Sequence, residues 1–135
     1  TLAGHSAFVY CVASSADGTR VVTGSSDTLV KIWNAETGAE VCTLTGHTDI
    51  VRFVAFSRDG TRIVSGSYDH LLKIWDAGSG AEPIILPGCP VIGHSRSVRQ
   101  VAFSGDGTQV ISAGDDQTVR FWEVASGRRV RQLEG

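Results

Sequence analysis

The sequence has no methionine, only three prolines and three cysteines among its 135 residues, and no excess of positive charge. Twelve lysines and arginines stand against 14 aspartates and glutamates, a formal net charge of −2, which argues against a nucleic-acid partner because that binding needs a clustered basic face. No apolar run approaches the roughly 18 to 20 residues of a membrane-spanning helix, so we expect no membrane partner. Because it lacks methionine and begins at Thr1, we expect the chain to be a segment of a longer protein.

The three cysteines, Cys11, Cys42 and Cys89, form no Cys-x-x-Cys motif and no pairing with histidine. We interpret them as single buried or half-buried thiols, and we expect no metal and no other cofactor. Unpaired thiols suit a reducing, intracellular setting, so we expect a cytoplasmic protein.

Two markers recur along the chain with steps of 42 and then 47 residues, which indicates three tandem repeats. They are the pairs Gly4-His5, Gly46-His47 and Gly93-His94, and the tryptophans Trp33, Trp75 and Trp122. We divide the chain into units 5–46, 47–93 and 94–135. The four preceding residues, 1–4, resemble residues 132–135 and are interpreted as the end of a preceding repeat.

Each unit reads as four short strands, which we expect in the second unit at 50–56, 62–65, 71–75 and 82–86. The first of these is a nearly continuous apolar run, as expected for a strand covered on both faces. Asp59-Gly60 supplies a tight hairpin because glycine accepts a positive φ, and Pro83 suits an outer edge strand. No helical periodicity competes, so the predicted fold class is all-β.

The repeated tetrapeptides Lys31–Asn34, Lys73–Asp76 and Arg120–Glu123 end the third strand of each unit with the sequences KIWN, KIWD and RFWE. Together with the Gly-His and Asp-Gly pairs, this pattern resembles the WD-repeat β-propeller family over the whole chain. The resemblance implies three four-stranded antiparallel blades, as one propeller segment spanning residues 1–135.

The resemblance also implies a hydrogen-bonded tetrad of histidine, hydroxyl residue, aspartate and tryptophan in each blade. The aspartate lies in the turn between the second and third strands and binds the imidazole, which faces a hydroxyl that receives the indole N–H. The sets are His5, Thr23, Asp27 and Trp33; His47, Ser65, Asp69 and Trp75; His94, Ser112, Asp116 and Trp122.

These residues contain the components of a hydrolase triad, but the sequence offers neither an exposed nucleophile nor an oxyanion site. We therefore interpret the tetrads as structural and predict no catalytic residue and no enzyme activity. No spacing of histidine, cysteine or carboxylate residues suggests a metal site.

Partners of WD-repeat proteins often dock where the second-to-third-strand turns meet the loops before each Gly-His pair. By this resemblance, the partner-binding residues lie three and five positions after each histidine and one before each tetrad aspartate. They are Phe8, Tyr10, Ser26, Ile50, Arg52, Tyr68, Ser97, Arg99 and Asp115. Aromatic residues and arginine dominate interface energetics. Phe8 and Ile50 could instead line the channel or pack on a neighbouring blade.

Three blades do not close a ring, since propellers have typically 4–8 of them. Either further repeats complete the propeller, or identical chains do so as a homo-oligomer, with a dimer giving six blades and a trimer nine. The five extra residues of the second unit fall in Leu86–Ile92, a proline-stiffened loop that could contact a partner or fold onto the blade edge.

The sequence therefore favours a non-catalytic protein–protein interaction scaffold or sensor module with a composite binding face. One alternative is a self-assembling structural propeller, natural or engineered. Another is a propeller that binds a small ligand or glycan, which needs matching polar pockets in every blade.

Overall fold

All regular structure in the computed structural model is β-strand, over the residues that it describes, 1–78 and 94–135. The strands form two four-stranded sheets and one three-stranded sheet, and every pairing between neighbouring strands is antiparallel. The prediction of an all-β fold built from propeller blades is confirmed. No helix in these two ranges is long and apolar enough to cross a membrane.

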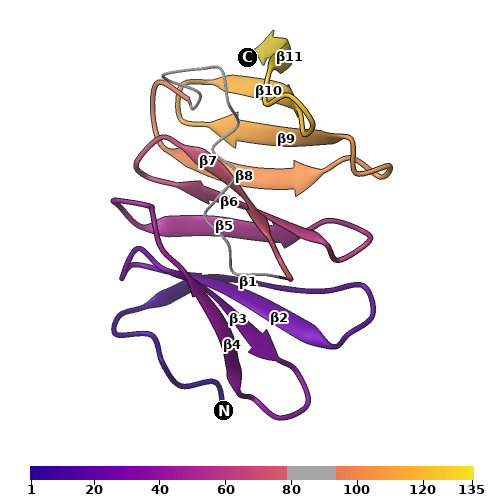
Figure 1. Ribbon diagram of the computed structural model, residues 1–135. Helices are drawn as coiled ribbons and strands as arrows, with labels where there is room; N and C mark the ends of the chain where they lie inside the picture. The colour runs from indigo at the N-terminus through magenta and orange to yellow at the C-terminus, as the bar shows by residue number, and fades with distance from the viewer. Residues whose placement is uncertain (79–93) are drawn as a thin grey trace.

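The sheets follow one another along the chain, and each is a simple meander (Figure 1). The first sheet contains β1 (Val9–Ser14), β2 (Arg20–Ser25), β3 (Val30–Asn34) and β4 (Glu40–Leu44). The second contains β5 (Val51–Phe56), β6 (Arg62–Ser67) and β7 (Leu72–Asp76). The third contains β8 (Val98–Phe103), β9 (Gln109–Gly114), β10 (Thr118–Glu123) and β11 (Arg129–Glu134). The strand expected at 82–86, the loop Leu86–Ile92 and Cys89 lie outside the described residues.

The hairpin between the first two strands of each sheet is specified by a local Ser-x-Asp-Gly-Thr sequence. In the first sheet, one carboxylate oxygen of Asp17 accepts hydrogen bonds from the Ser15 hydroxyl at 2.6 Å and from the Thr19 amide at 2.9 Å. Gly18 follows with a φ of 71°, in the left-handed region that glycine enters without steric cost. The same contacts recur around Asp59 and Asp106.

We expect these turns to make the fold sensitive to acid. The hydrogen bonds from the serine hydroxyl, and then from the threonine, lower the pKa of Asp17, Asp59 and Asp106 from 3.8 to about 2. A lowered pKa contributes stability that is fully present above the unfolded value and is lost as pH falls toward the folded one. We therefore expect the melting temperature, measured by circular dichroism, to fall between about pH 4 and about pH 2.

Asp17→Asn tests the cause of that acid sensitivity. The variant should melt at a lower temperature near neutral pH and should lose less stability on acidification than the unsubstituted chain. A melting temperature that stays constant down to about pH 2 would contradict the assignment.

The sheets lie one on the next (Figure 1). The residues between them form two apolar cores. The first strand of the second and third sheets packs on the first two strands of the sheet before it. Thus β5 packs on β1 and β2, and β8 packs on β5 and β6. Val51 of β5 and Val98 of β8 are fully buried in these interfaces. Val22 and Ile32 belong to the first core.

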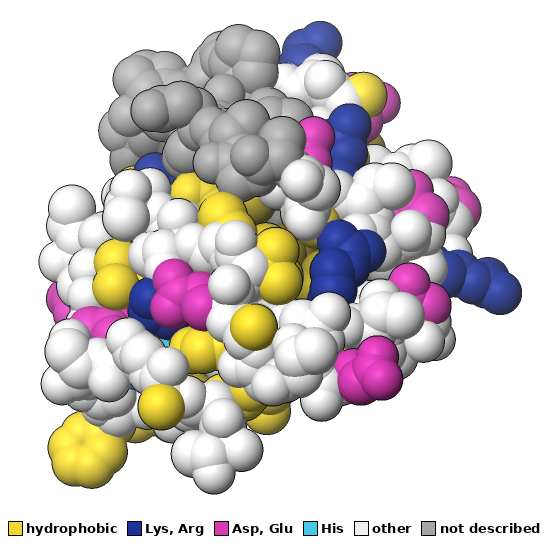
Figure 2. Space-filling view, turned by 60° about the horizontal axis from the view of Figure 1, so that its bottom comes forward, with side chains coloured by type: hydrophobic (Ala, Val, Ile, Leu, Met, Phe, Trp, Pro, Cys, Tyr) yellow, Lys and Arg dark blue, Asp and Glu magenta, His cyan; other side chains and the backbone are white. Residues whose placement is uncertain are grey.

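The end of the stack formed by the first sheet lies open to solvent. In Figure 2, which turns this end forward, hydrophobic side chains are exposed among polar and charged ones. Among the exposed large hydrophobic residues are Phe8, at 80% of its full surface, and Val12, at 66%. Solvent-facing apolar residues of this kind are candidates for contact with another surface.

Candidate functional site

The structure brings the four tetrad residues of each sheet together. In the first sheet, His5 lies 2.8 Å from Asp27 through Nδ1 and 2.8 Å from the Thr23 hydroxyl through Nε2. The indole N–H of Trp33 donates to the same hydroxyl at 2.8 Å. The hydroxyl thus connects the imidazole to the indole, and every side chain in the network has a partner.

The same network recurs in the other two sheets with nearly the same distances. His47 lies 2.6 Å from Asp69 and 2.7 Å from the Ser65 hydroxyl, which also accepts from Trp75 at 2.8 Å. In the third sheet the corresponding distances are all 2.8 Å, within His94, Ser112, Asp116 and Trp122.

Backbone amides hold each tetrad aspartate in place. Asp69 accepts from the amide of Thr48 at 3.1 Å and from that of Leu71 at 2.9 Å. Burial by itself raises the pKa of Asp69, but the hydrogen bonds from His47 and these amides outweigh it, so the pKa lies below its usual value. The carboxylate is therefore ionised and links the loop before β5 to the turn after β6.

The third tetrad differs because Gly114 replaces the serine found at this position in the first two sheets, Ser25 and Ser67. In those sheets the serine hydroxyl accepts from the amide of the tetrad aspartate. Here Thr118 donates its hydroxyl to Asp116 at 2.8 Å, and Arg120 donates to the same carboxylate at 2.9 Å. Neither of these two supporting contacts was predicted from the sequence.

The tetrad hydroxyls are not free to react. The side chains of Ser65 and Ser112 are buried, and each hydroxyl already accepts an indole N–H. A nucleophile must reach its substrate, so these contacts suit a structural role. In residues 1–78 and 94–135, no group of three histidine, cysteine, aspartate or glutamate residues could hold a metal ion.

The nine predicted partner-binding residues gather at one end of the strands. In every sheet, the residue three after the histidine and the residue before the tetrad aspartate are joined through the backbone. The amide of Ser26 donates to the carbonyl of Phe8, that of Tyr68 to Ile50 and that of Asp115 to Ser97, at 2.9, 3.0 and 2.9 Å. We call this set of nine residues the upper face.

The residues five after each histidine occupy β-bulges. The register of β1 with β2 pairs Val9 with Ser25 and Cys11 with Gly24, so Tyr10 has no partner in the ladder. Arg52 and Arg99 stand at the same position of β5 and β8. An extra residue of this kind re-aims its side chain, and here all three meet residues of the upper face.

Arginine–aromatic contacts connect neighbouring sheets across the upper face. The Arg52 guanidinium lies 4.6 Å from the centre of the Tyr10 ring, and that of Arg99 lies 5.1 Å from the Tyr68 ring. Arg99 also donates to the Tyr68 hydroxyl at 2.8 Å and to both carboxylate oxygens of Asp115 at 2.7 and 2.6 Å. These contacts fix large side chains in one arrangement.

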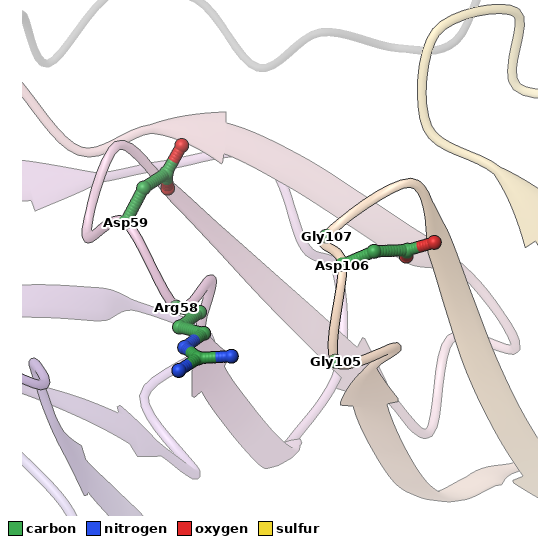
Figure 3. A pocket seen from close by; sticks show the side chains of 5 residues that line it. All are labelled: Arg58, Asp59, Gly105, Asp106 and Gly107. Carbon is green, nitrogen blue, oxygen red and sulfur yellow. The ribbon is translucent and has the colours of Figure 1, made fainter.

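The opposite end of the strands carries a hollow of about 330 Å³ between two hairpin turns (Figure 3). It is lined by Arg58, Asp59, Gly105, Asp106 and Gly107. Both carboxylates accept hydrogen bonds within their own turns. The hollow therefore has one cation and no convergent set of polar groups.

At this end of the strands, a contact between the first two sheets was not predicted from the sequence. Arg20 donates to the carbonyl of Gly60 at 2.7 Å and to that of Ala77 at 3.1 Å, and its guanidinium lies 5.4 Å from the Phe56 ring. An arginine at the start of a strand gives no sequence signal for contacts with residues 36 to 57 positions away.

The repeated sheets, tetrads and turns agree with a comparison of the sequence against known families. The family described as "WD domain, G-beta repeat" matches residues 1–34, 38–76 and 88–123. The chain belongs to the WD-repeat family. The second matched segment contains β4 to β7, so the family's repeat begins one strand earlier than the unit 47–93.

Individual WD-repeat proteins match parts of the chain. Over 44 residues it is 46% identical to "WD repeat-containing protein 1" of Mus musculus, covering 33% of this chain and 7% of that protein. Over 38 residues it is 53% identical to "Vegetative incompatibility protein HET-E-1" of Podospora anserina, covering 28% of this chain and 3% of that protein. The chain therefore matches only a small part of the length of these curated relatives.

Solved WD-repeat structures share the fold of the whole chain. "Structure of U3-55K" superposes with a TM-score of 0.89 at 27% identity, over 99% of this chain and 41% of that one, and the values for "Crystal structure of RRP9 WD40 repeats" are the same. WD-repeat domains are in general non-catalytic scaffolds that bind proteins.

Proposed function

We propose that this chain is a non-catalytic scaffold or sensor segment that binds a partner protein through the upper face. The observation that carries the proposal is the pair of cross-sheet stacks, Arg52 on Tyr10 and Arg99 on Tyr68. Arginine and tyrosine are enriched among the residues that contribute most to binding, and side chains already held in place lose less entropy when a partner binds.

Phe8 adds an apolar anchor at the edge of the upper face. Its side chain is 80% exposed, and only its backbone carbonyl is engaged, by the amide and the hydroxyl of Ser26. An aromatic ring open to water gains free energy when a partner covers it. Phe8 also belongs to the open end of the stack, so its exposure agrees with a partner contact and equally with packing on a neighbouring blade.

The upper face gives little support to a repeated glycan or small-ligand site. Such a site needs the same polar groups in corresponding pockets. The residues three after the histidines are Phe8, Ile50 and Ser97, two apolar side chains and one hydroxyl, so the three sheets do not repeat a polar group at this position. A single composite surface for a protein explains this variation better than three equivalent pockets.

The test compares variants at the two ends of the strands. The immobilised chain is incubated with an extract of the cells it comes from, and the retained proteins are quantified by mass spectrometry. Arg52→Ala/Tyr68→Ala should reduce retention of a stoichiometric partner by about tenfold or more, with the melting temperature nearly unchanged.

Arg58→Ala is the matched control, since Arg58 is exposed at the opposite end of β5. It should retain the partner as the unsubstituted chain does. If the control loses the partner and the double variant keeps it, the upper face is not the binding surface.

We also propose that the protein is intracellular, because of its cysteines. Cys11 and Cys42 are both free thiols. Burial, opposed by weaker effects of Gly24 and Arg52, raises the pKa of the Cys11 thiol to about 11, which keeps it protonated and unreactive. Unpaired cysteines of this kind suit a reducing compartment.

A further inference from the structure

At each end of the stack one sheet face is exposed, although the corresponding faces of the sheets inside the stack are buried. Val9 of β1 corresponds to Val51 of β5 and Val98 of β8, since each precedes the bulge. Val51 and Val98 are 0% exposed, whereas Val9 is 50% exposed. We call the surface around Val9 and Val12 the N-terminal open face.

The other end presents the opposite side of the third sheet. By register, Gln100, Ala102, Ile111 and Ala113 correspond to the residues of β1 and β2 that contact the second sheet. They line a shallow hollow of about 230 Å³ together with Val101 and Ser112. We call this surface the C-terminal open face.

Inside the stack, a valine of one sheet always packs on a glycine of the sheet before it. A Cβ added to Gly24 would lie 2.6 Å from Cγ1 of Val51, and one added to Gly66 would lie 2.7 Å from Cγ1 of Val98. Such distances are far below van der Waals contact, and valine has little rotamer freedom with which to retreat. A valine at the start of one sheet's first strand therefore requires a glycine at the facing position of the sheet before it.

The C-terminal open face has an alanine, Ala113, at the position of these glycines. Ala113 pairs with Gln100 as Gly24 pairs with Cys11 and Gly66 with Phe53, so it stands where the glycines stand. By this register, its Cβ would stand where a Cβ added to Gly24 or Gly66 meets a valine of the next sheet. The N-terminal open face of a second copy would bring Val9 to this position.

We propose that Ala113 makes the C-terminal open face selective for one kind of partner. This face accepts a β-blade of the same fold that has a residue smaller than valine at the position of Val51 and Val98. It rejects a second copy of this chain, which has Val9 at that position. The continuity with the two interior interfaces identifies the occupant as a blade, and the methyl group of Ala113 sets the size of the residue that faces it. Selection against a wrong partner by a steric clash is a common route to specificity. This inference is independent of the upper face and speaks against a ring completed by identical chains.

Sedimentation velocity tests the proposal on the chain and two variants. The unsubstituted chain should stay at its monomer mass of 14.3 kDa. Ala113→Gly removes the clash from one side and Val9→Ala removes it from the other. Each variant alone should form head-to-tail assemblies at concentrations at least tenfold lower than the unsubstituted chain requires.

Two further variants show which surfaces associate. Ala113→Gly/Val12→Arg puts a charge on the N-terminal open face and should return the mass to that of a monomer. Gly105→Ala changes a glycine with no neighbour within 4 Å of its added Cβ and should leave the mass unchanged. The proposal is overturned if the unsubstituted chain associates as readily as Ala113→Gly, if neither single variant associates, or if the double variant still does.

Discussion

Asp69→Ala should lower the free energy of unfolding by about 2–4 kcal/mol, because it removes a buried carboxylate that joins three parts of the second sheet. The substitution leaves the His47 imidazole and the amides of Thr48 and Leu71 without their acceptor. Buried polar groups without partners carry the full cost of their desolvation. Urea unfolding followed by tryptophan fluorescence measures the change.

The matched control is Asp49→Ala, in the same sheet and at the same end of the strands. The Asp49 side chain is exposed, and among residues 1–78 and 94–135 it accepts only from the neighbouring amide of Ile50, at 2.7 Å. Its removal should change the free energy of unfolding by about 0.5 kcal/mol or less. Equal effects of the two substitutions would show that the tetrad does not hold the blade together.

Gly66→Ala should destabilise the chain by about 1–3 kcal/mol, since the added methyl group would overlap Val98 of the next sheet. The backbone of Gly66 lies in a strand and has no positive φ, so strain in the backbone does not contribute. The whole effect comes from the interface between the second and third sheets. The transition midpoint in urea reports it.

A double substitution isolates that contact. Val98→Ala creates a cavity and costs stability on its own, but combined with Gly66→Ala it should recover part of the loss, because the two methyl-sized changes compensate. Gly105→Ala, which meets no atom within 4 Å, should leave the midpoint within about 0.5 kcal/mol. Additive losses in the double variant would contradict the steric explanation.

The tetrad and the glycine–valine contact stabilise two different levels of the same architecture. The tetrad fixes the loop before each sheet to the turn inside it, whereas the glycine–valine contact fixes one sheet to the next. The upper face depends on both, since Tyr68 belongs to one sheet and its partner Arg99 to the next. A variant that loosens either level should also weaken partner binding.

The sequence was a good guide to the turns and the strand order. Asp59-Gly60 and its two counterparts form hairpins because their conformation is decided within five residues. The tetrad residues meet in the structure because the strand lengths between them are constant in all three units. The end of the second unit lies outside the described residues, and the partner-binding role of the upper face remains a prediction.

Contacts between sheets could not be derived from the sequence. Tyr10 and Arg52 are 42 residues apart, and only the bulge and the spacing of the sheets bring the guanidinium over the ring. The first repeat has Ser14 where the others have Phe56 and Phe103, a change that leads one to expect a weaker blade. In the structure Phe56 packs on the first sheet, whereas Ser14 is exposed on the open end, where no described sheet covers it.

The sequence by itself determined the all-β class and the repeat, because both depend on spacing within one unit of the chain. Its resemblance to the WD-repeat family implied the four-residue networks. Only the tertiary structure decided which residues of neighbouring units touch, and therefore at which glycines a side chain would overlap the next sheet. Gly24 and Gly66 each meet a valine of the next sheet, Val51 and Val98, and only the position of that valine makes an added methyl group costly. The physical reason is that packing between sheets depends on three-dimensional distances of a few tenths of an ångström, which no local pattern encodes.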